Sequence, residues 1–227
     1  MKKTIMILDT ETCNIEQTEQ VKRGNNLTYN IGWQVVTPCN GEVLEQRSYL
    51  IDEIFLGEVD RMTSCYYAEK IPQYFDGLWD GSYEIESFFT VLLNIERACK
   101  EYNVTAICAH NAAFDVDALN TTLRYLTGYE YIRALPQGIE IWDSMKMASS
   151  VFGKRPTYRK FCQDNGFMTK HATPRPRLTA EVLYRFITND IDFEEEHTAL
   201  ADVIIETAIV LACYRSHKKF DRILYPA

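Results

Sequence analysis

The hydrophobic pattern of the first fifty residues predicts three consecutive strands. Residues 4–9 form a short apolar run that is typical of a buried strand. Residues 28–37 and 42–50 contain the β-branched and aromatic residues that strands favour, and the link between them includes Asn40-Gly41, a pair typical of hairpin turns. Three strands joined by short links indicate that the sheet begins antiparallel.

The rest of the chain alternates between extended and helical patterns. Buried strands are predicted at residues 103–109 and 139–142, where short apolar runs occur. Helical periodicity or capping signals predict helices over six ranges, which are 84–102, 112–126, 144–150, 157–165, 178–188 and 198–217. This order predicts an α/β domain with a mixed five-stranded sheet, three antiparallel strands followed by parallel ones, flanked by helices.

Residues 52–82 interrupt the regular order. They are rich in aromatic residues, contain Gly77 and Gly81 as helix breakers, and follow neither the helical nor the strand period. We expect an irregular, aromatic-rich insertion within a single domain that spans residues 1–227. With 227 residues and 46% hydrophobic content, the chain has enough apolar material for one large core.

The composition excludes several classes of protein. No run of 18 apolar residues occurs, so no membrane-spanning helix is expected, and Asp9 interrupts the first apolar stretch too early for a signal peptide. The seven cysteines are scattered and include no Cys-x-x-Cys pair, which argues against a disulfide framework and against a structural zinc site. We therefore expect a reducing, cytoplasmic setting, with the cysteines acting as small buried hydrophobic residues.

The first candidate motif is Asp9-Thr10-Glu11, which follows the apolar residues 5–8. Positions two apart on an extended chain point to the same face, so both carboxylates are expected to project together at the end of the strand. Two acids this close repel each other unless a cation neutralises them. The alternative is a solvated loop start, and this short motif alone does not decide between the two.

The second motif is His110-Asn111-Ala112-Ala113-Phe114-Asp115, directly after the strand predicted at residues 103–109. Taken alone, His110 suits a hydrogen-bonded loop histidine, and Asp117 suits an acid in the first turn of a helix. The complete pattern His-Asn-x-x-Phe-Asp is rare at average amino-acid usage, so it indicates a functional site.

The third motif is His197-Thr198-Ala199-Leu200-Ala201-Asp202, at the start of the last predicted helix. Residues five apart on a helix lie about 140° apart around its axis, so His197 and Asp202 cannot share one helical face. His197 is therefore expected in the loop before the helix, with Thr198 as the N-cap, above a site that Asp202 reaches. The adjacent glutamates 194–196 are expected to form a solvated face.

Together the three motifs resemble those of the DEDDh (DnaQ-like) 3′-to-5′ exonucleases, which have a ribonuclease H-like fold. Asp-x-Glu, His-Asn-x-x-Phe-Asp and His-x-Ala-x-x-Asp occur here in the order of that family, and the resemblance spans residues 4–215. It implies hydrolysis at a free 3′ end of single-stranded or frayed DNA or RNA, with two divalent cations, Mg²⁺ or Mn²⁺. The small chain, with its scattered cysteines and lysine-rich tail, is also reminiscent of phage-encoded members.

The resemblance assigns roles by position. Four acids would hold the two cations and one histidine would be the general base, and this set is Asp9, Glu11, Asp115, Asp202 and His197. The expected substrate contacts near these motifs are Thr10, Thr12, Ile15, His110, Asn111 and Phe114, and Arg155 and Arg159 are added from a basic segment and not from the resemblance. The chemistry agrees with these roles, because hard carboxylate oxygens favour Mg²⁺ or Mn²⁺. A histidine with a pKa near ~6.5 can also accept a proton close to neutral pH.

A basic segment, residues 153–177, stands out in a chain with a net charge of −8. Its basic residues are Lys154, Arg155, Arg159, Lys160, Lys170, Arg175 and Arg177, against the single acid Asp164. The aromatic residues Tyr158, Phe161 and Phe167 are interleaved with them. A nucleic-acid strand needs phosphate neutralisation and a stacking surface, so this segment is predicted to follow its backbone. A plain solvated loop is the alternative.

The chain departs from the family pattern at two places. The family often has Glu-Thr-Thr-Gly-Leu after the first acid, whereas this chain has Glu11-Thr12-Cys13-Asn14-Ile15, with Ile15 as the expected wedge against the terminal base. Residues 52–82 do not resemble the usual proofreading subunit, so no polymerase partner is implied, and no membrane is expected.

Two other functions are compatible with the same motifs. The first is a catalytically silent nucleic-acid-binding module on this fold, although all five catalytic positions are filled. The second is a phosphodiesterase that clears very short oligonucleotides, because the same site would serve that reaction.

Overall fold

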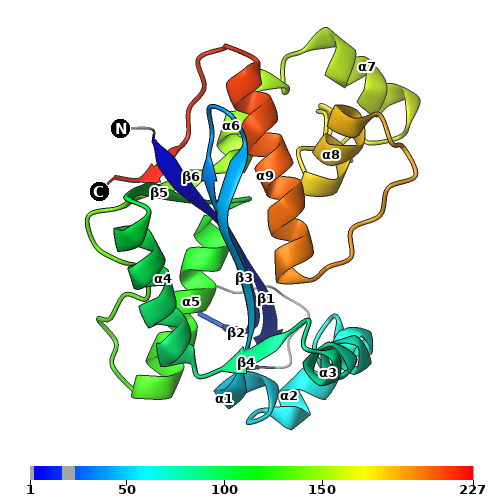
Figure 1. The fold of residues 1–227 in the computed structure, drawn as a ribbon. Coiled ribbons are helices and arrows are strands. Elements are labelled where there is room, and N and C mark those ends of the chain that lie inside the picture. The colour runs from blue at the N-terminus through cyan, green and yellow to red at the C-terminus, as the bar shows by residue number, and fades with distance from the viewer. Residues whose placement is uncertain (1–2, 17–23, 227) are drawn as a thin grey trace.

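A seven-stranded mixed sheet forms the centre of the computed structural model, which describes residues 3–16 and 24–226 (Figure 1). Its strands are β1 (Thr4–Asn14), β2 (Asn26–Thr37), β3 (Glu42–Ile51), β4 (Glu84–Glu86), β5 (Val104–Ala109), β6 (Glu140–Asp143) and β7 (Ile223–Tyr225). They lie in the order β4-β3-β2-β1-β5-β6-β7. The pairs β1–β2 and β2–β3 are antiparallel, whereas β1–β5 and β5–β6 are parallel.

The predicted fold class is therefore confirmed, with a correction to the strand count. The five predicted strands are the central five, and β4 and β7 extend the sheet at its two edges. Each edge strand has only three residues, which is too short for a period of two to be recognised. Residues 84–86, predicted as the start of a helix, form β4 instead, because Ser87 caps α4 by accepting a hydrogen bond from Thr90 N.

Helices flank both faces of the sheet. They are α1 (Asp52–Phe55), α2 (Val59–Thr63), the 3₁₀ helix η1 (Ala68–Lys70), α3 (Ile71–Asp80), α4 (Phe88–Glu101), α5 (Ala113–Thr127), α6 (Ser144–Val151), α7 (Pro156–Asp164), α8 (Ala180–Thr188) and α9 (Ala199–Arg215). Residues of α1–α5 pack into one hydrophobic cluster, and residues of α6–α9 pack into a second. On β1, Met6 and Leu8 belong to the first cluster, while Ile5 and Ile7 belong to the second.

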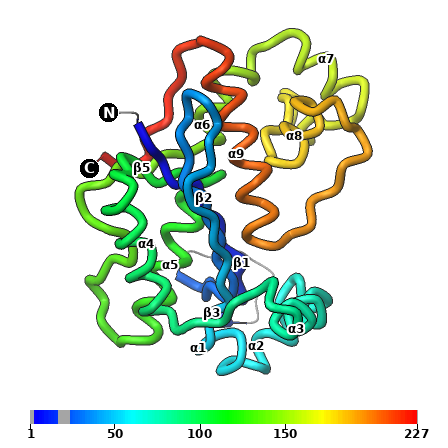
Figure 2. The backbone as a smooth tube through the Cα atoms, in the orientation of Figure 1, coloured from blue at the N-terminus to red at the C-terminus, as the bar shows by residue number. Residues whose placement is uncertain are grey.

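The prediction that residues 52–82 are irregular is wrong. They form α1, α2, η1 and α3, which lie together beyond one end of the sheet (Figure 2). Gly77 does not break α3; its missing side chain makes room for Tyr83, whose ring carbon would lie 2.1 Å from an added Cβ. Gly81 ends the helix with a left-handed φ of 80°, as C-terminal glycines commonly do. α1, α2 and η1 have only three to five residues, which gives too few turns for a readable hydrophobic period, whereas α3 has ten residues and was missed because its glycines suggested a break.

Most cysteines are small buried residues, as the composition predicts. Within the described residues all seven are free thiols, and five are buried: Cys13, Cys99, Cys108, Cys162 and Cys213. Among the helices of residues 3–16 and 24–226, none has the length and apolar character needed to cross a membrane.

The N-terminus of α9 is fixed against β2 by a buried asparagine. The Asn30 side-chain oxygen accepts a hydrogen bond from Ala199 N at 3.0 Å. Thr198 is the N-cap residue, as predicted, but within the described chain its own hydroxyl makes no capping bond. Gly32 of β2 lies directly against the backbone of the first turn of α9, since a Cβ on Gly32 would be only 2.7 Å from Leu200 N. Gly32 is also the β2 partner of Asp9, so these contacts bring the first turn of α9 to the acids of β1.

We expect Gly32→Ala to destabilise the protein by about 1–3 kcal/mol, because the added methyl group must push backbone atoms of α9 away from the sheet. Gly138→Ala is the control. Its φ of 77° gives a strain of about 1–2 kcal/mol in a left-handed residue, with no described atom within 4 Å of the new carbon. The first turn of α9 carries Asp202, one of the acids expected to hold a cation. Mg²⁺ should therefore raise the denaturant midpoint of Gly138→Ala as in the parent chain and raise that of Gly32→Ala much less. If Mg²⁺ raised the denaturant midpoint of both variants equally, Gly32 would not be needed to bring the first turn of α9 to the acids of β1.

Candidate active site

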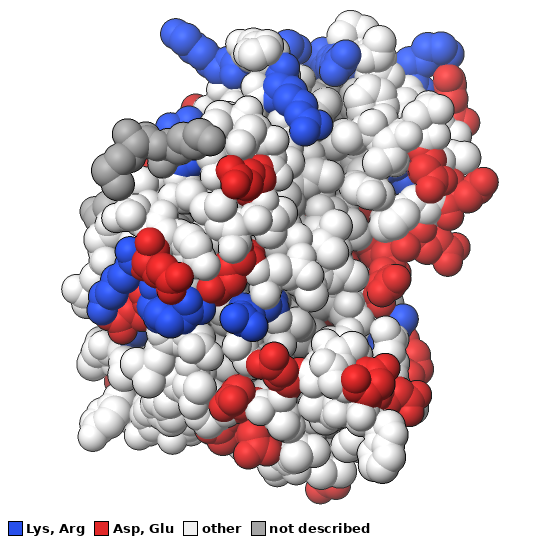
Figure 3. All heavy atoms as spheres, viewed as in Figure 1, with Lys and Arg blue, Asp and Glu red and all other residues white. Residues whose placement is uncertain are grey.

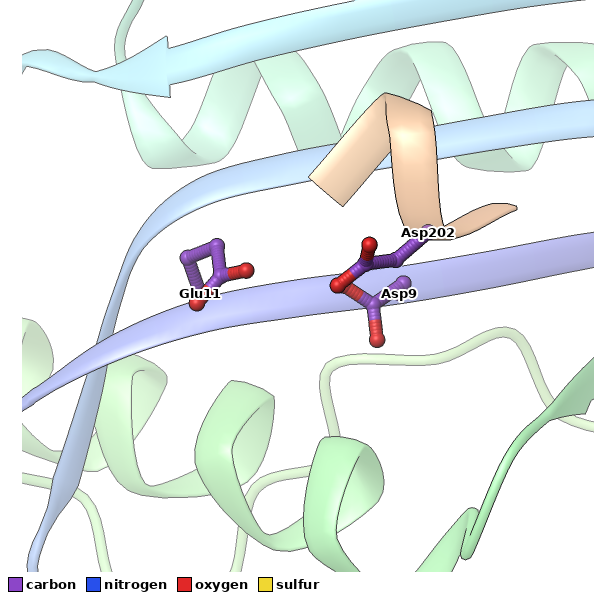
Figure 4. A group of neighbouring side chains, drawn as sticks. All are labelled: Asp9, Glu11 and Asp202. Atoms are coloured by element: carbon purple, nitrogen blue, oxygen red, sulfur yellow. The ribbon is translucent and has the colours of Figure 1, made fainter. Parts of the chain in front are cut away.

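Two acids of β1 and one acid of α9 converge at the same point. Asp9 and Glu11 continue the alternation of Ile5 and Ile7, so they face α9. One carboxylate oxygen from each of Asp9, Glu11 and Asp202 lies within 4.8 Å of the other two (Figure 4). We call these three residues the acidic triad.

The prediction that Asp9 and Glu11 project from the end of the strand is wrong, because both acids lie within β1. The strand continues to Asn14, and its register with β2 shifts between Glu11 and Thr12. Such bulges are common beside active sites, where they redirect a side chain. Figure 4 shows the Asp202 carboxylate next to that of Asp9, with Glu11 farther along the same strand.

Asp115 lies beside the acidic triad, in the first turn of α5. It is 3% exposed, and its Oδ1 accepts a hydrogen bond from the Thr10 hydroxyl at 2.9 Å. Among the described residues, the group with mutual distances under 4.8 Å does not include it. Burial raises the pKa of Asp115 to about 7, although the Thr10 hydrogen bond opposes the shift.

The electrostatics of the site favour a cation. Burial, followed by repulsion from Asp115, raises the pKa of Asp9 well above its ordinary value. Burial and the charge of Asp202 raise the pKa of Glu11 to about 9, and burial raises the pKa of Asp202 to about 7. The buried Asp202 Oδ1 also has no hydrogen-bond partner within the described chain. Hard oxygen donors, mutual repulsion and an unpartnered oxygen together fit one or more divalent cations.

His197 lies at the rim of the site, just before α9. Its φ of 53° is left-handed, and its side chain is 36% exposed. Its ring stacks on Tyr67 with centroids 4.6 Å apart and an interplanar angle of 18°, and its Nδ1 lies 3.8 Å from Glu195 Oε2. Burial, then the charge of Lys70, lowers the pKa of His197. The neutral imidazole is therefore available as a proton acceptor near pH 7.

Sequence reasoning missed four residues around this site. Tyr67 and Lys70 come from the segment predicted to be irregular, and no sequence signal pointed to them. Glu195 was predicted to be part of a solvated face, but its side chain is only 15% exposed, and burial and Asp202 raise its pKa to about 7. Glu206, 2% exposed, is four residues after Asp202 and thus on the same helical face, a spacing that could have revealed it.

The second motif contributes residues of different character. Both ring nitrogens of His110 are engaged, with Nδ1 2.8 Å from Ser144 Oγ and Nε2 2.6 Å from Leu178 O, so its ring has no nitrogen free for a substrate. Asn111 is exposed with a left-handed φ of 64°. Phe114 is half-buried, and within the described residues it belongs to neither hydrophobic cluster, so part of its ring is accessible.

At the end of β1, Thr12 and Ile15 are half-buried. Ile15 packs against the first hydrophobic cluster, and its carbonyl oxygen accepts a hydrogen bond from Arg61. Thr10, by contrast, is buried and bonded to Asp115, so it supports an acid of the site directly.

The basic segment lies far from the acidic triad. Arg155 and Arg159 are exposed at α7, near the C-terminal end of α9, whereas Asp202 is at its N-terminal end (Figure 1). Basic side chains gather at that end of the molecule, and acidic ones gather along the edge where the segment between α8 and α9 runs (Figure 3). The expected stacking surface is wrong, because Tyr158 is buried and Phe161 and Phe167 pack against the second hydrophobic cluster.

No protein-family model matches the chain, and no curated protein sequence matches it significantly. Solved structures do share its fold. The nuclease domain of 3′hExo, a DEDDh family member, bound to rAMP, has a TM-score of 0.61 at 11% identity, over 100% of this chain and 98% of that chain. A 3′-exonuclease recognising the 3′ end of a histone mRNA stem-loop has a TM-score of 0.58 at 8% identity, over 96% and 84%.

E. coli ExoI in its zinc-bound complex with single-stranded DNA has a TM-score of 0.53 at 15% identity. The alignment covers 95% of this chain and 41% of that chain. At these identities the likeness concerns the fold, and it confirms the ribonuclease H-like architecture implied by the motifs.

We expect the metal-free protein to lose stability as the pH rises from 6.5 to 8. In this range the folded state retains a proton on groups such as Glu11, whose pKa is about 9, while the unfolded chain has released it. Folding therefore binds protons, and one such group costs about 2 kcal/mol over 1.5 pH units. Denaturant unfolding in EDTA measures this, and Mg²⁺ should flatten the slope. Stability that is constant or increasing with pH in EDTA would contradict the proposed electrostatics.

Proposed function

We propose that this chain is a metal-dependent 3′-to-5′ exonuclease of the DEDDh type. The observation that supports it most strongly is the convergence of Asp9 and Glu11 from β1 with Asp202 from α9, beside Asp115. These side chains come from three separate motifs whose spacing resembles that family. Solved 3′-exonuclease structures with the same fold support the proposal further.

Four carboxylates would hold the cations. Asp9, Glu11 and Asp202 offer oxygens within 4.8 Å of one another, and Asp115 extends the group toward α5. Two Mg²⁺ or Mn²⁺ ions bound there would supply charge neutralisation on the phosphate and lower the pKa of water. The Thr10 hydroxyl orients Asp115 for this task through its hydrogen bond.

His197 would accept the proton of the attacking water. Its stacking on Tyr67 restricts the ring, and its lowered pKa keeps it unprotonated near neutral pH. The half-buried Ile15 and Phe114 would contact the terminal nucleotide, with Thr12 and Asn111 nearby in sequence. Because the ring nitrogens of His110 are occupied, its contribution would be to hold the loop that precedes Asp115.

The substrate would be nucleic acid with a free 3′ end. Arg155 and Arg159 would contact only a strand long enough to extend from the acidic triad along α9, because α7 lies at the other end of that helix. A reducing, cytoplasmic setting accords with seven free thiols among the described residues.

The direct test is digestion of single-stranded DNA and RNA labelled at the 5′ end. With Mg²⁺ or Mn²⁺ we expect a ladder that shortens from the 3′ end, and no cleavage in excess EDTA. Asp9→Asn should reduce the cleavage rate by several orders of magnitude, since it removes the charge of one of the proposed cation ligands. Full activity in EDTA, or equal cleavage of a 3′-blocked strand or closed circle, would refute the proposal.

His197→Gln should lower kcat by ~10²–10⁴-fold with little change in KM, because it removes the proton acceptor but retains a polar side chain of similar size. The acid limb of the pH–rate profile should also disappear. His217→Gln is a matched control, since His217 has the same φ of 53° but follows the far end of α9. An unchanged kcat and acid limb in His197→Gln would exclude this role.

A further inference from the structure

Glu206 is a buried carboxylate that none of the three motifs includes. It lies on α9 one turn after Asp202, and its side chain is only 2% exposed. Its Oε2 has no hydrogen-bond partner anywhere in residues 3–16 and 24–226. The adjacent turns of α9 bury apolar residues such as Ile205, Ile209 and Val210, so packing alone would favour an apolar residue here.

The neighbours of Glu206 make its burial more costly. Besides burial, repulsion from Asp115 and Asp202 raises its pKa well above the ordinary value, and the backbone amide of His110 opposes this only in part. Glu206 in turn raises the pKa of Asp9. A buried carboxylate that has one oxygen without a partner and lies among other acids is unfavourable in a protein interior unless a cation compensates it.

The charge of the complete group fits this explanation. Five carboxylates interact at the site. Asp9, Glu11 and Asp202 have oxygens within 4.8 Å of one another, while Asp115 and Glu206 are outside that group of described residues but repel Asp9. If all are ionised, they carry five negative charges, which two divalent cations would nearly balance. Without cations the same group must bind protons or repel itself.

We propose that Glu206 is a further carboxylate ligand for a divalent cation of the Mg²⁺ or Mn²⁺ class, extending the acidic triad into the interior toward Asp115. This inference rests on the metal site of the proposed function, but it concerns cation binding and not the cleavage reaction.

The test compares the full chain with Glu206→Gln, a substitution that keeps the shape and removes the charge. In EDTA, Glu206→Gln should have a higher melting temperature than the parent chain, because a self-repelling buried acid has been removed. With Mn²⁺ alone, its affinity measured by titration calorimetry should fall at least tenfold, and the Mn²⁺-induced rise in melting temperature should shrink.

Glu194→Gln is the matched control, since it removes an equal charge from an exposed residue of the segment before α9. It should leave both the melting temperature in EDTA and the Mn²⁺ affinity close to those of the parent chain. A general effect of net charge would change both variants alike and would overturn the inference.

Two further outcomes would overturn it. Glu206→Gln with parental Mn²⁺ affinity would make Glu206 a buried structural acid, and Glu206→Gln that fails to fold in EDTA would contradict the predicted stabilisation. The exonuclease assay on the same samples separates the two proposals. A parent chain that binds Mn²⁺ through Glu206 without cleaving nucleic acid would refute only the function.

Discussion

Repulsion among buried and half-buried carboxylates is the constraint on which the rest of this structure depends. β1, α5 and α9 bring their acids to one place, where burial raises the pKa values of Asp9, Glu11, Asp115 and Asp202. Packing does not account for a cluster of carboxylates at this place. Each acid whose pKa is raised by folding lowers the stability of the metal-free fold at neutral pH. Cation binding would resolve the conflict, because the same oxygens that destabilise the free protein would become ligands.

The fold maintains this arrangement through residues that are neither proposed cation ligands nor the proposed proton acceptor. Asn30 and Gly32 on β2 let the N-terminus of α9 approach the sheet beside Asp9, and Thr10 holds Asp115 from the opposite face of β1. Because adjacent residues of a strand point to opposite faces, one short segment of β1 positions acids and their support on both sides of the sheet. The segment of residues 52–80 then adds Tyr67, the N-cap residue of η1, whose ring restricts His197.

The sequence predicts those parts that depend on local periodicity. Strands such as residues 4–9, the long helix α9, the fold class and the pairing of Asp9 with Glu11 all follow from such patterns. The edge strands and the helices α1, α2 and η1 are too short to produce a pattern, and α3 was missed because Gly77 and Gly81 suggested a break. Tyr67 and Glu195 reach the site only through tertiary packing, whereas Glu206 lies one helical turn after Asp202, a spacing that the sequence does contain. The aromatics of residues 153–177 were assigned to a binding surface because composition does not distinguish an exposed ring from one that packs in the core.

The most direct test of the account is the location of Mn²⁺ in crystals grown with that ion, measured by anomalous diffraction near the manganese absorption edge. We expect anomalous peaks among the carboxylates of Asp9, Glu11, Asp115 and Asp202, with two ions ~4 Å apart at full occupancy. An ordered cluster without an anomalous peak, with Mn²⁺ bound elsewhere on the surface, would contradict the claim that cations balance these acids.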